Sequence, residues 1–203
     1  MSVKERIIEV SSSLFIMHGI RALTMGEIAK ALGISKRTIY EHFETKEQLL
    51  EGCLDYWEME NKRIEKEIHD SSANPVEVVH KHFRHAVMFL ANIHGSFFTD
   101  LKKHHSRLWR NRYKCMEHQK LSNITEFFES GVKDGYFRKD SKHEIAAKLF
   151  FAQVDVLHDN NVFPPDQFSK TDVFREIIVV FLRGICTEKG MKETERLFNN
   201  QNF

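Results

Sequence analysis

One short stretch gathers side chains of the types that contact nucleic acids: Lys36, Arg37, Thr38, Tyr40 and Glu41. On a helix that advances about 100° per residue, Arg37 and Glu41 point nearly opposite the apolar Ile39. Arg can read guanine with two hydrogen bonds, Glu can accept from cytosine N4, and Thr or Tyr can bond phosphate oxygens. Taken alone, this face also fits the solvated, charged side of an ordinary helical hairpin.

Local signals predict two short helices that would position this face. The first helix begins after Thr24, which forms a capping box with Glu27, three residues further on. It ends at Gly33, a residue suited to the left-handed conformation that closes a helix. Ser35 then caps a second helix over residues 36–43. A helix, a short turn containing Gly and a second helix together form the helix-turn-helix pattern.

This region closely resembles the DNA-binding domain of the TetR family of bacterial transcriptional regulators. The likeness runs nearly gap-free from about Arg6 to Leu50, and three segments carry it: Thr24-Met25-Gly26-Glu27-Ile28-Ala29, Gly33-Ile34-Ser35-Lys36-Arg37-Thr38-Ile39-Tyr40-Glu41-His42-Phe43 and Lys46-Glu47-Gln48-Leu49-Leu50. The resemblance implies a sequence-specific, DNA-binding repressor that a small-molecule effector releases from its operator. It also places a set of residues at the DNA surface: Thr24, Lys36, Thr38, Tyr40 and His42.

Geometry adds two further candidates for DNA contact. Arg37 faces away from the expected core, so we expect it to read a base edge. Lys46 lies on the first turn of the next helix, so we expect it to contact a phosphate. The role of Glu41 is open, because it could read cytosine or only repel unsuitable sequences.

Composition indicates the class of protein and its compartment, but gives little information about its function. The chain has 203 residues, of which 41% are hydrophobic, and its formal net charge is +1, so total charge gives no indication of DNA binding. The three cysteines show neither metal spacing nor a disulfide framework, which favours a reducing cytoplasm. The N-terminus lacks the apolar region of a signal peptide, and no apolar run is long enough to span a bilayer.

Helical periodicity continues along the chain, and no strand signal or repeat occurs. An opening helix is expected over residues 3–18. The later helices are expected over residues 45–69, 75–93, 97–103, 106–130, 141–158 and 172–188. We expect a loop over residues 160–170 and a short tail from residue 191, with Gly190 ending the last helix. The prediction is an all-α fold, with an N-terminal three-helix helix-turn-helix domain over residues 1–48 and a larger helical effector-binding and dimerisation domain over residues 49–203.

Two local start signals support particular helices. Asn74 and Glu77 supply a cap and an N-terminal carboxylate around Pro75, the first residue of its helix. Ser141 and Glu144 have the spacing of another capping box.

The expected helices over 144–158 and 172–188 are apolar on most of their circumference. A helix that is apolar all round must be buried on all sides. Burial within a single core is one solution, but two such helices in a chain of this size favour a homodimer through a four-helix interface. The TetR resemblance implies the same dimer. A charge introduced at Val179 or Phe181 is expected to give monomers or insoluble protein.

A possible effector site follows from aromatic and polarizable side chains on two middle helices: Phe83, Phe89, Trp109, Tyr113 and Met116. Trp109, Tyr113 and Met116 share one helix face, and such a stripe also fits plain core packing. The pocket interpretation rests on the TetR resemblance, with Tyr113, His82 and His85 as polar contacts for a mostly apolar ligand. The alternative is a DNA-binding regulator controlled by a protein partner, with no small-molecule ligand.

Catalytic and metal chemistry have little support in the sequence. The twelve histidines include His82 and His85 three residues apart, but no compact Cys/His spacing of a zinc site occurs. No Gly-rich phosphate loop, Gly-x-Ser-x-Gly elbow or His-Glu-x-x-His motif is present. We therefore expect no enzyme activity, no metal and no cofactor.

Overall fold

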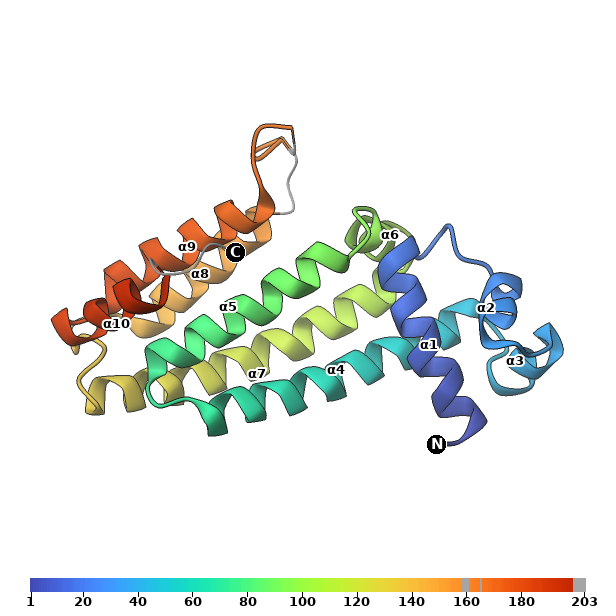
Figure 1. The fold of residues 1–203 in the computed structure, drawn as a ribbon, viewed down its shortest axis with the longest axis horizontal. Helices are drawn as coiled ribbons and strands as arrows, with labels where there is room; N and C mark the ends of the chain where they lie inside the picture. The colour runs from blue at the N-terminus through green and yellow to red at the C-terminus, as the bar shows by residue number, and fades with distance from the viewer. Residues whose placement is uncertain (158–160, 165, 199–203) are drawn as a thin grey trace. The chain divides into compact units, whose positions relative to one another are not determined.

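The structure is a computed structural model that describes residues 1–157, 161–164 and 166–198, without the side chains of residues 113–124. Ten helices follow one another in the described part (Figure 1): α1 Val3–His18, α2 Met25–Leu32, α3 Lys36–His42, α4 Lys46–Ser71, α5 Pro75–Asn92, α6 Phe97–His104, α7 Ser106–Lys133, α8 His143–Val156, α9 Lys170–Ile185 and α10 Glu188–Phe198. Within these residues β pairing is limited to an isolated bridge between Phe137 and Cys186. The prediction of an all-α fold is confirmed.

The chain forms two compact units. The N-terminal unit comprises Met1–Lys66 and Ala91–Lys114, and the C-terminal unit comprises Glu67–Leu90 and Cys115–Phe203. Helices α4, α5 and α7 therefore each contribute to both units. The functional boundary expected near residue 48 is a different division, and it stays a prediction.

The core of the N-terminal unit joins α1 to the three helices that follow it. Ile7, Ile28, Ile39 and Leu49 come from α1, α2, α3 and α4, and all four side chains are buried. Helix α6 adds Phe97 and Leu101 to the same core. On α7, Arg112 forms ion pairs with Asp55 and Glu58 of α4. The second half of the unit thus braces the helix-turn-helix helices.

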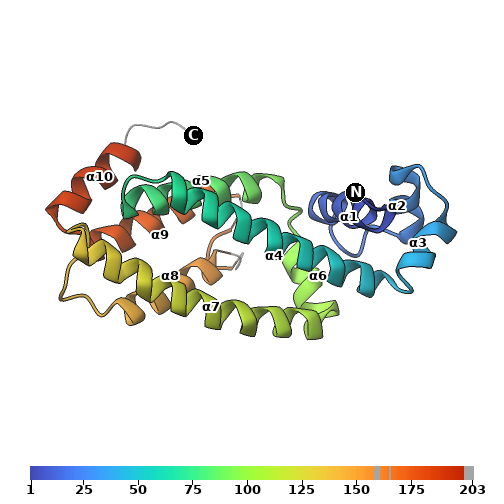
Figure 2. The same cartoon turned by 90° about the horizontal axis from the view of Figure 1, so that it is seen from below.

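The core of the C-terminal unit is rich in phenylalanine. Phe83 on α5 packs against Phe174 on α9 and Phe198 on α10, with ring centroids 5.5 and 5.6 Å apart respectively. Phe128 and Phe137 pack around the turn that follows α7, 5.5 Å apart. Helices α8 and α9 run side by side, and α10 folds back against α9 (Figure 2).

Helix α10 corrects the expected tail. Residues Glu188–Phe198 are helical, and Thr194 and Phe198 are buried. Gly190 does not end a helix, because it lies inside α10 where a Cβ atom would stand 2.4 Å from the Tyr136 carbonyl oxygen. Glycine is needed here for a close approach between segments distant in the sequence, whereas the sequence interpretation had assigned it to helix termination.

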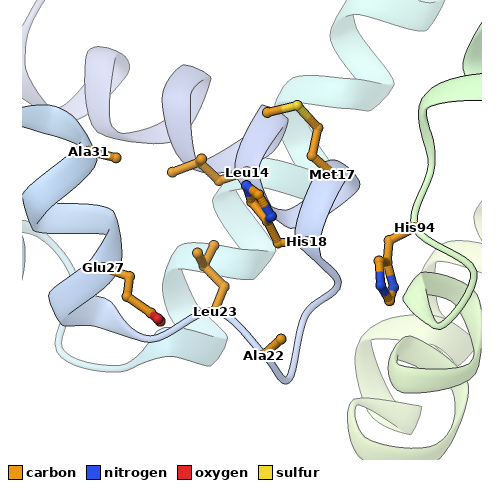
Figure 3. Close-up of a pocket in the computed structure, with 8 residues that line it drawn as sticks. All are labelled: Leu14, Met17, His18, Ala22, Leu23, Glu27, Ala31 and His94. Carbon is orange, nitrogen blue, oxygen red and sulfur yellow. The ribbon is translucent and has the colours of Figure 1, made fainter.

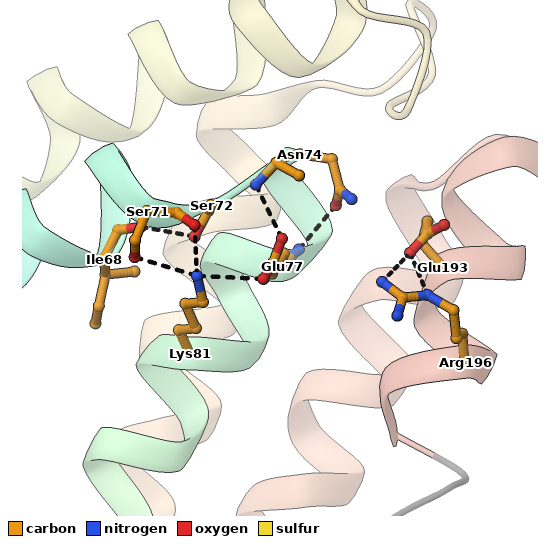
Figure 4. A network of polar contacts seen from close by, with 9 residues as sticks. Ile68, Ser71, Ser72, Asn74, Glu77, Lys81, Glu193 and Arg196 are labelled. Atoms are coloured by element: carbon orange, nitrogen blue, oxygen red, sulfur yellow. Dashed lines mark hydrogen bonds and ion pairs between the residues drawn. The ribbon is translucent and has the colours of Figure 1, made fainter.

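The start signal at Asn74 is confirmed. The Asn74 Oδ1 atom accepts from the Glu77 backbone N–H at 2.9 Å, and the Glu77 carboxylate accepts from the Ala73 N–H at 2.9 Å. Lys81 donates to the Ser71 carbonyl at 2.8 Å and lies 3.2 Å from Glu77, which ties the end of α4 to α5 (Figure 4).

The capping box expected at Ser141 and Glu144 is wrong. Helix α8 begins at His143 after Lys142, with no side-chain cap, and the Glu144 carboxylate pairs instead with Lys148 at 2.8 Å. At the other end, α8 stops at Val156. His158, Asn160 and Pro165, which the sequence assigned to the end of this helix and the next loop, lie outside the described residues. No helix among the described residues is both long and apolar enough to cross a membrane.

Candidate nucleic-acid interface

The helix-turn-helix predicted from the sequence is present, and its helix ends are capped as expected. Thr24 Oγ1 accepts from the Glu27 N–H at 3.2 Å, and the Glu27 carboxylate accepts from the Thr24 N–H at 2.6 Å. Gly33 closes α2 in the left-handed conformation, with φ of 66°. Ser35 Oγ accepts from the Thr38 N–H at 3.0 Å and caps α3. These local bonds fix the angle at which α3 leaves the turn.

Helix α3 presents a polar face to solvent. Ile39 is fully buried, whereas the Arg37 and Glu41 side chains are 89% and 56% exposed. Arg37 donates from Nε to a Glu41 oxygen at 3.1 Å. The Lys36 ammonium lies 5.7 Å from the centroid of the exposed Tyr40 ring. The face therefore carries two cations, each held by a partner one helical turn further on.

The remaining DNA candidates lie in α3 and at the start of α2, in the N-terminal unit. Thr24 is exposed at the start of α2, and His42 is exposed at the end of α3. Thr38 is partly exposed, and its hydroxyl lies 2.9 Å from that of Ser35. Hydroxyl, imidazole and cationic groups thus occur on α3 and at the start of α2. Their contact with DNA stays a prediction.

Lys46 is less accessible than the sequence suggested. It is the first residue of α4, but it is only partly exposed, and its ammonium lies 6.0 Å from the centroid of the Phe15 ring. Burial lowers the pKa of Lys46, and the negative charges of Asp100 and Glu27 partly offset that effect. A phosphate that binds Lys46 would have to compete with these carboxylates for the ammonium group.

Asp100 is a residue of this region that the sequence interpretation missed. Its buried carboxylate accepts from the Arg21 backbone N–H at 3.2 Å and from the Ser96 hydroxyl at 3.1 Å. In the same segment the His94 N–H donates to the carbonyl oxygen of Ile16 on α1 at 2.7 Å. Helix α6 therefore holds the loop that leads from α1 into α2. The sequence offered no signal for this bond, because its partners are 79 residues apart.

An open hollow of about 440 Å³ lies beside these contacts in the N-terminal unit. Figure 3 shows the eight residues that line it, drawn from α1, α2, their connecting loop and the segment before α6: Leu14, Met17, His18, Ala22, Leu23, Glu27, Ala31 and His94. A second open hollow, of about 320 Å³, is lined by Asp55, Glu58, Met59 and Lys62 of α4. Neither hollow is lined by a residue expected to bind an effector.

The described effector candidates are divided between the two compact units. Phe83 is fully buried in the core of the C-terminal unit, and Phe89 in the same unit is 36% exposed. Trp109 belongs to the N-terminal unit, where its ring packs edge-on against Phe98 at 6.5 Å and the Lys102 ammonium lies 4.9 Å from its centroid. The side chains of Tyr113 and Met116 lie outside the described residues. An effector site made of these residues stays a prediction.

His82, one of the histidines considered as a metal ligand, has a lowered pKa. Burial, followed by the charges of His85 and His69, lowers the pKa of His82, which favours its neutral form at pH 7. Among the described residues, no group of three His, Cys, Asp or Glu side chains is arranged to hold a metal ion.

Comparisons with known proteins agree with the helix-turn-helix geometry. The family profile described as "Bacterial regulatory proteins, tetR family" matches residues 7–53. The transcriptional repressor KstR2 of Mycobacterium tuberculosis is 28% identical over 194 residues, which cover 92% of this chain and 94% of KstR2. The uncharacterized HTH-type transcriptional regulator YvaF of Bacillus subtilis is 23% identical over 174 residues, which cover 85% of this chain and 90% of YvaF.

Solved structures extend the likeness to the whole fold. A TetR-family regulator from Agrobacterium tumefaciens superposes with a TM-score of 0.70 at 15% identity, covering 91% of this chain and 97% of that one. The structure of KstR2, titled a ketosteroid transcriptional regulator, superposes with a TM-score of 0.54 at 21% identity, covering 92% of this chain and 96% of that one. All of these similar proteins are named as transcriptional regulators or repressors. Residues 7–53, which contain the helix-turn-helix, are thus identified as the DNA-binding domain of the TetR family of bacterial transcriptional regulators.

Proposed function

We propose that this protein is a repressor that reads its operator with the outward face of α3. The observation that carries the proposal is the exposed row of Lys36, Arg37, Tyr40 and Glu41 on a helix whose opposite side is anchored by the buried Ile39. Such a helix places donors and acceptors in a major groove, while cations at its ends meet phosphates. The protein would act in the cytoplasm, where bacterial DNA lies.

A two-fold homodimer is the second part of the proposal. Apolar side chains stand exposed along α8 and α9, with Ile145 at 54%, Leu149 at 60% and Val180 at 54%. Large apolar side chains left exposed on neighbouring helices indicate a protein interface. A second copy would cover them and would present two α3 helices to a pseudo-palindromic operator.

The positions chosen from sequence for disrupting the dimer, Val179 and Phe181, also pack within the chain itself. Phe181 is only partly exposed, because its ring packs 4.7 Å from Phe150 and 6.1 Å from Phe128 within the chain. Val179 also packs against the core of the C-terminal unit, so a charge at either position would disturb folding first. Leu149 and Val180 are the appropriate sites.

Release by a small apolar effector completes the proposal. A structural relative is titled a ketosteroid transcriptional regulator, and this title supports a mostly apolar ligand for a related fold. The effector must bind one dimer geometry better than another, because a ligand shifts an equilibrium only by its differential affinity. Control by a protein partner is the alternative. Native mass spectrometry of the purified dimer separates the two: a co-purified small molecule supports an effector, and a bound polypeptide supports a partner.

The DNA-binding proposal is tested by selection. Purified protein is used to recover fragments from sheared chromosomal DNA of the source bacterium, and recovered fragments are compared with input. We expect enrichment of one inverted repeat, bound by the dimer at nanomolar concentration in competition with random DNA. Equal recovery of all fragments would overturn the proposal, because backbone binding alone carries no sequence information.

A further inference from the structure

Glu41 places a negative charge on the face of α3 that is proposed to meet DNA. An exposed carboxylate repels phosphates and so opposes binding to every DNA sequence. Its oxygen accepts the hydrogen bond from Arg37 Nε at 3.1 Å, and both side chains are more than half exposed. The contact is therefore a surface pair that adds little to folding. Since Glu41 opposes DNA binding in general and adds little to folding, a role in recognising particular sequences would account for its presence on this face.

The bond uses a particular part of the Arg37 side chain. A guanidinium group carries five N–H donors in a planar fork, one on Nε and two on each Nη atom. With the Nε–H directed at Glu41, the outer edge formed by the two Nη atoms is the part turned away from that partner. Guanine offers two acceptors, O6 and N7, which match two N–H groups of one edge.

Holding the guanidinium before DNA arrives has an energetic advantage. A free arginine side chain samples many rotamers, and binding must select one of them. A partner that limits this freedom in the unbound protein reduces the entropy lost on binding. The gain applies only where the presented edge finds its two acceptors, so it increases discrimination more than overall affinity.

We propose that Glu41 is a specificity-determining residue that acts through Arg37, by fixing the guanidinium so that its outer edge reads a guanine. The inference rests on the proposed function, because it takes α3 as the reading helix. The neighbouring pair provides a contrast: Lys36 is held by the ring of Tyr40, four residues on, without a negative charge. Lysine is a compact point charge suited to a phosphate, whereas the arginine fork requires orientation.

The second carboxylate oxygen of Glu41 allows an alternative to the positioning role. It could accept directly from cytosine N4 at a neighbouring base pair. The two roles differ in their dependence on Arg37, since positioning requires the arginine and direct reading does not. A double-mutant cycle measures this dependence.

The experiment uses the full-length protein and its selected inverted repeat, with a set of duplexes in which each base pair of one half-site is changed in turn. Affinity is measured by fluorescence anisotropy for wild type, Arg37→Ala, Glu41→Ala, Glu41→Gln and the double variant Arg37→Ala/Glu41→Ala. The matched control is Glu193→Ala, which removes an equivalent bond from Arg196 Nε, 2.8 Å long, on α10 (Figure 4). Circular dichroism confirms that each variant is folded.

Positioning predicts that Glu41→Ala reduces discrimination by about tenfold at the same guanine that Arg37→Ala identifies. Glu41→Gln should retain most of the discrimination, because its amide oxygen can still accept from Nε. Glu41→Ala should have no further effect on discrimination in the Arg37→Ala background, and Glu193→Ala should match wild type.

Two outcomes would overturn the inference. If Glu41→Ala changes preference at another base pair, equally with and without Arg37, the carboxylate reads DNA directly. If it raises affinity for all duplexes by one common factor, the carboxylate only repels phosphates. A wild-type protein that shows no sequence preference would instead contradict the proposed function, and that result is distinguishable from both.

Discussion

The outward face of α3 and the exposed side of the α8–α9 pair both present large side chains to water, but their chemistry is opposite. Helix α3 shows charged groups arranged in local pairs, whereas α8 and α9 show Ile145, Leu149 and Val180. Charged groups lose little by remaining hydrated, so α3 is stable as it stands. Exposed apolar groups are stabilised only when a partner removes them from water. One surface thus suits reversible contact with DNA, and the other suits lasting contact with protein.

The comparison distinguishes side chains that stabilise the fold from those that bind a partner. Among the variants proposed here, Phe83→Ala should cause the largest loss of stability. Phe83 is fully buried between Phe174 and Phe198. Its truncation should lower the free energy of unfolding by about 3–5 kcal/mol, measured by urea denaturation. Phe89→Ala, at a partly exposed position of the same helix, should cost far less. Unchanged stability together with a lost effector response would instead make Phe83 a ligand contact.

Leu149→Glu tests the apolar surface. A carboxylate at this exposed position should prevent a second copy from docking, so sedimentation equilibrium should show a monomer with unchanged helix content. Loss of two-site binding should weaken operator affinity by about 100-fold or more. Val162→Glu is the control, since Val162 is similarly exposed but lies outside α8 and α9. A Leu149→Glu protein that remains dimeric would show that the interface lies elsewhere.

Asp100→Ala tests whether the bond from Arg21 to Asp100 helps to position α2 and α3. The change leaves the Arg21 N–H without its carboxylate acceptor and should cost about 1–3 kcal/mol. It should also reduce the preference for operator over random DNA at temperatures well below unfolding. Asp100→Asn should restore both properties, because an amide oxygen can accept the same bond. Equal operator preference in all three proteins would show that the bond does not position α2 and α3.

Arg37→Ala tests base reading on α3 directly. It should weaken operator binding by about 1–3 kcal/mol and relax preference at one base pair per half-site, with stability unchanged. Affinity is measured against the set of substituted duplexes. A loss of the same size on operator and random DNA would assign Arg37 to the phosphate backbone.

Lys46→Ala should have the smallest effect. If the ammonium leaves its half-buried position to bind a phosphate, the variant should weaken all sequences alike and lower the salt slope by about one. The measurement is affinity at a series of salt concentrations. An unchanged slope would show that Lys46 remains near Asp100 and Glu27 in the complex, as in the structure described here.

The α2–α3 region could be predicted closely because its determinants are local. Thr24 with Glu27, and Ser35 with Thr38, are three residues apart, and each pair forms the bond that its spacing predicts. The burial of Ile39 and the exposure of Arg37 follow from helical periodicity in the same way. Propensity, capping and side-chain direction all act within one or two helical turns, so seven consecutive residues were sufficient to define α3.

Other features depended on contacts that no spacing reveals. The Arg21–Asp100 bond joins residues 79 apart. Gly190 belongs to α10 because of a neighbour at Tyr136, and Phe83 is core because Phe174 and Phe198 enclose it. On α9, Val179 and Val180 are equivalent by composition, but only packing makes Val180 the exposed one. An apolar residue specifies that it should be buried, but the partner that buries it is chosen by the whole chain, since hydrophobic attraction has no direction.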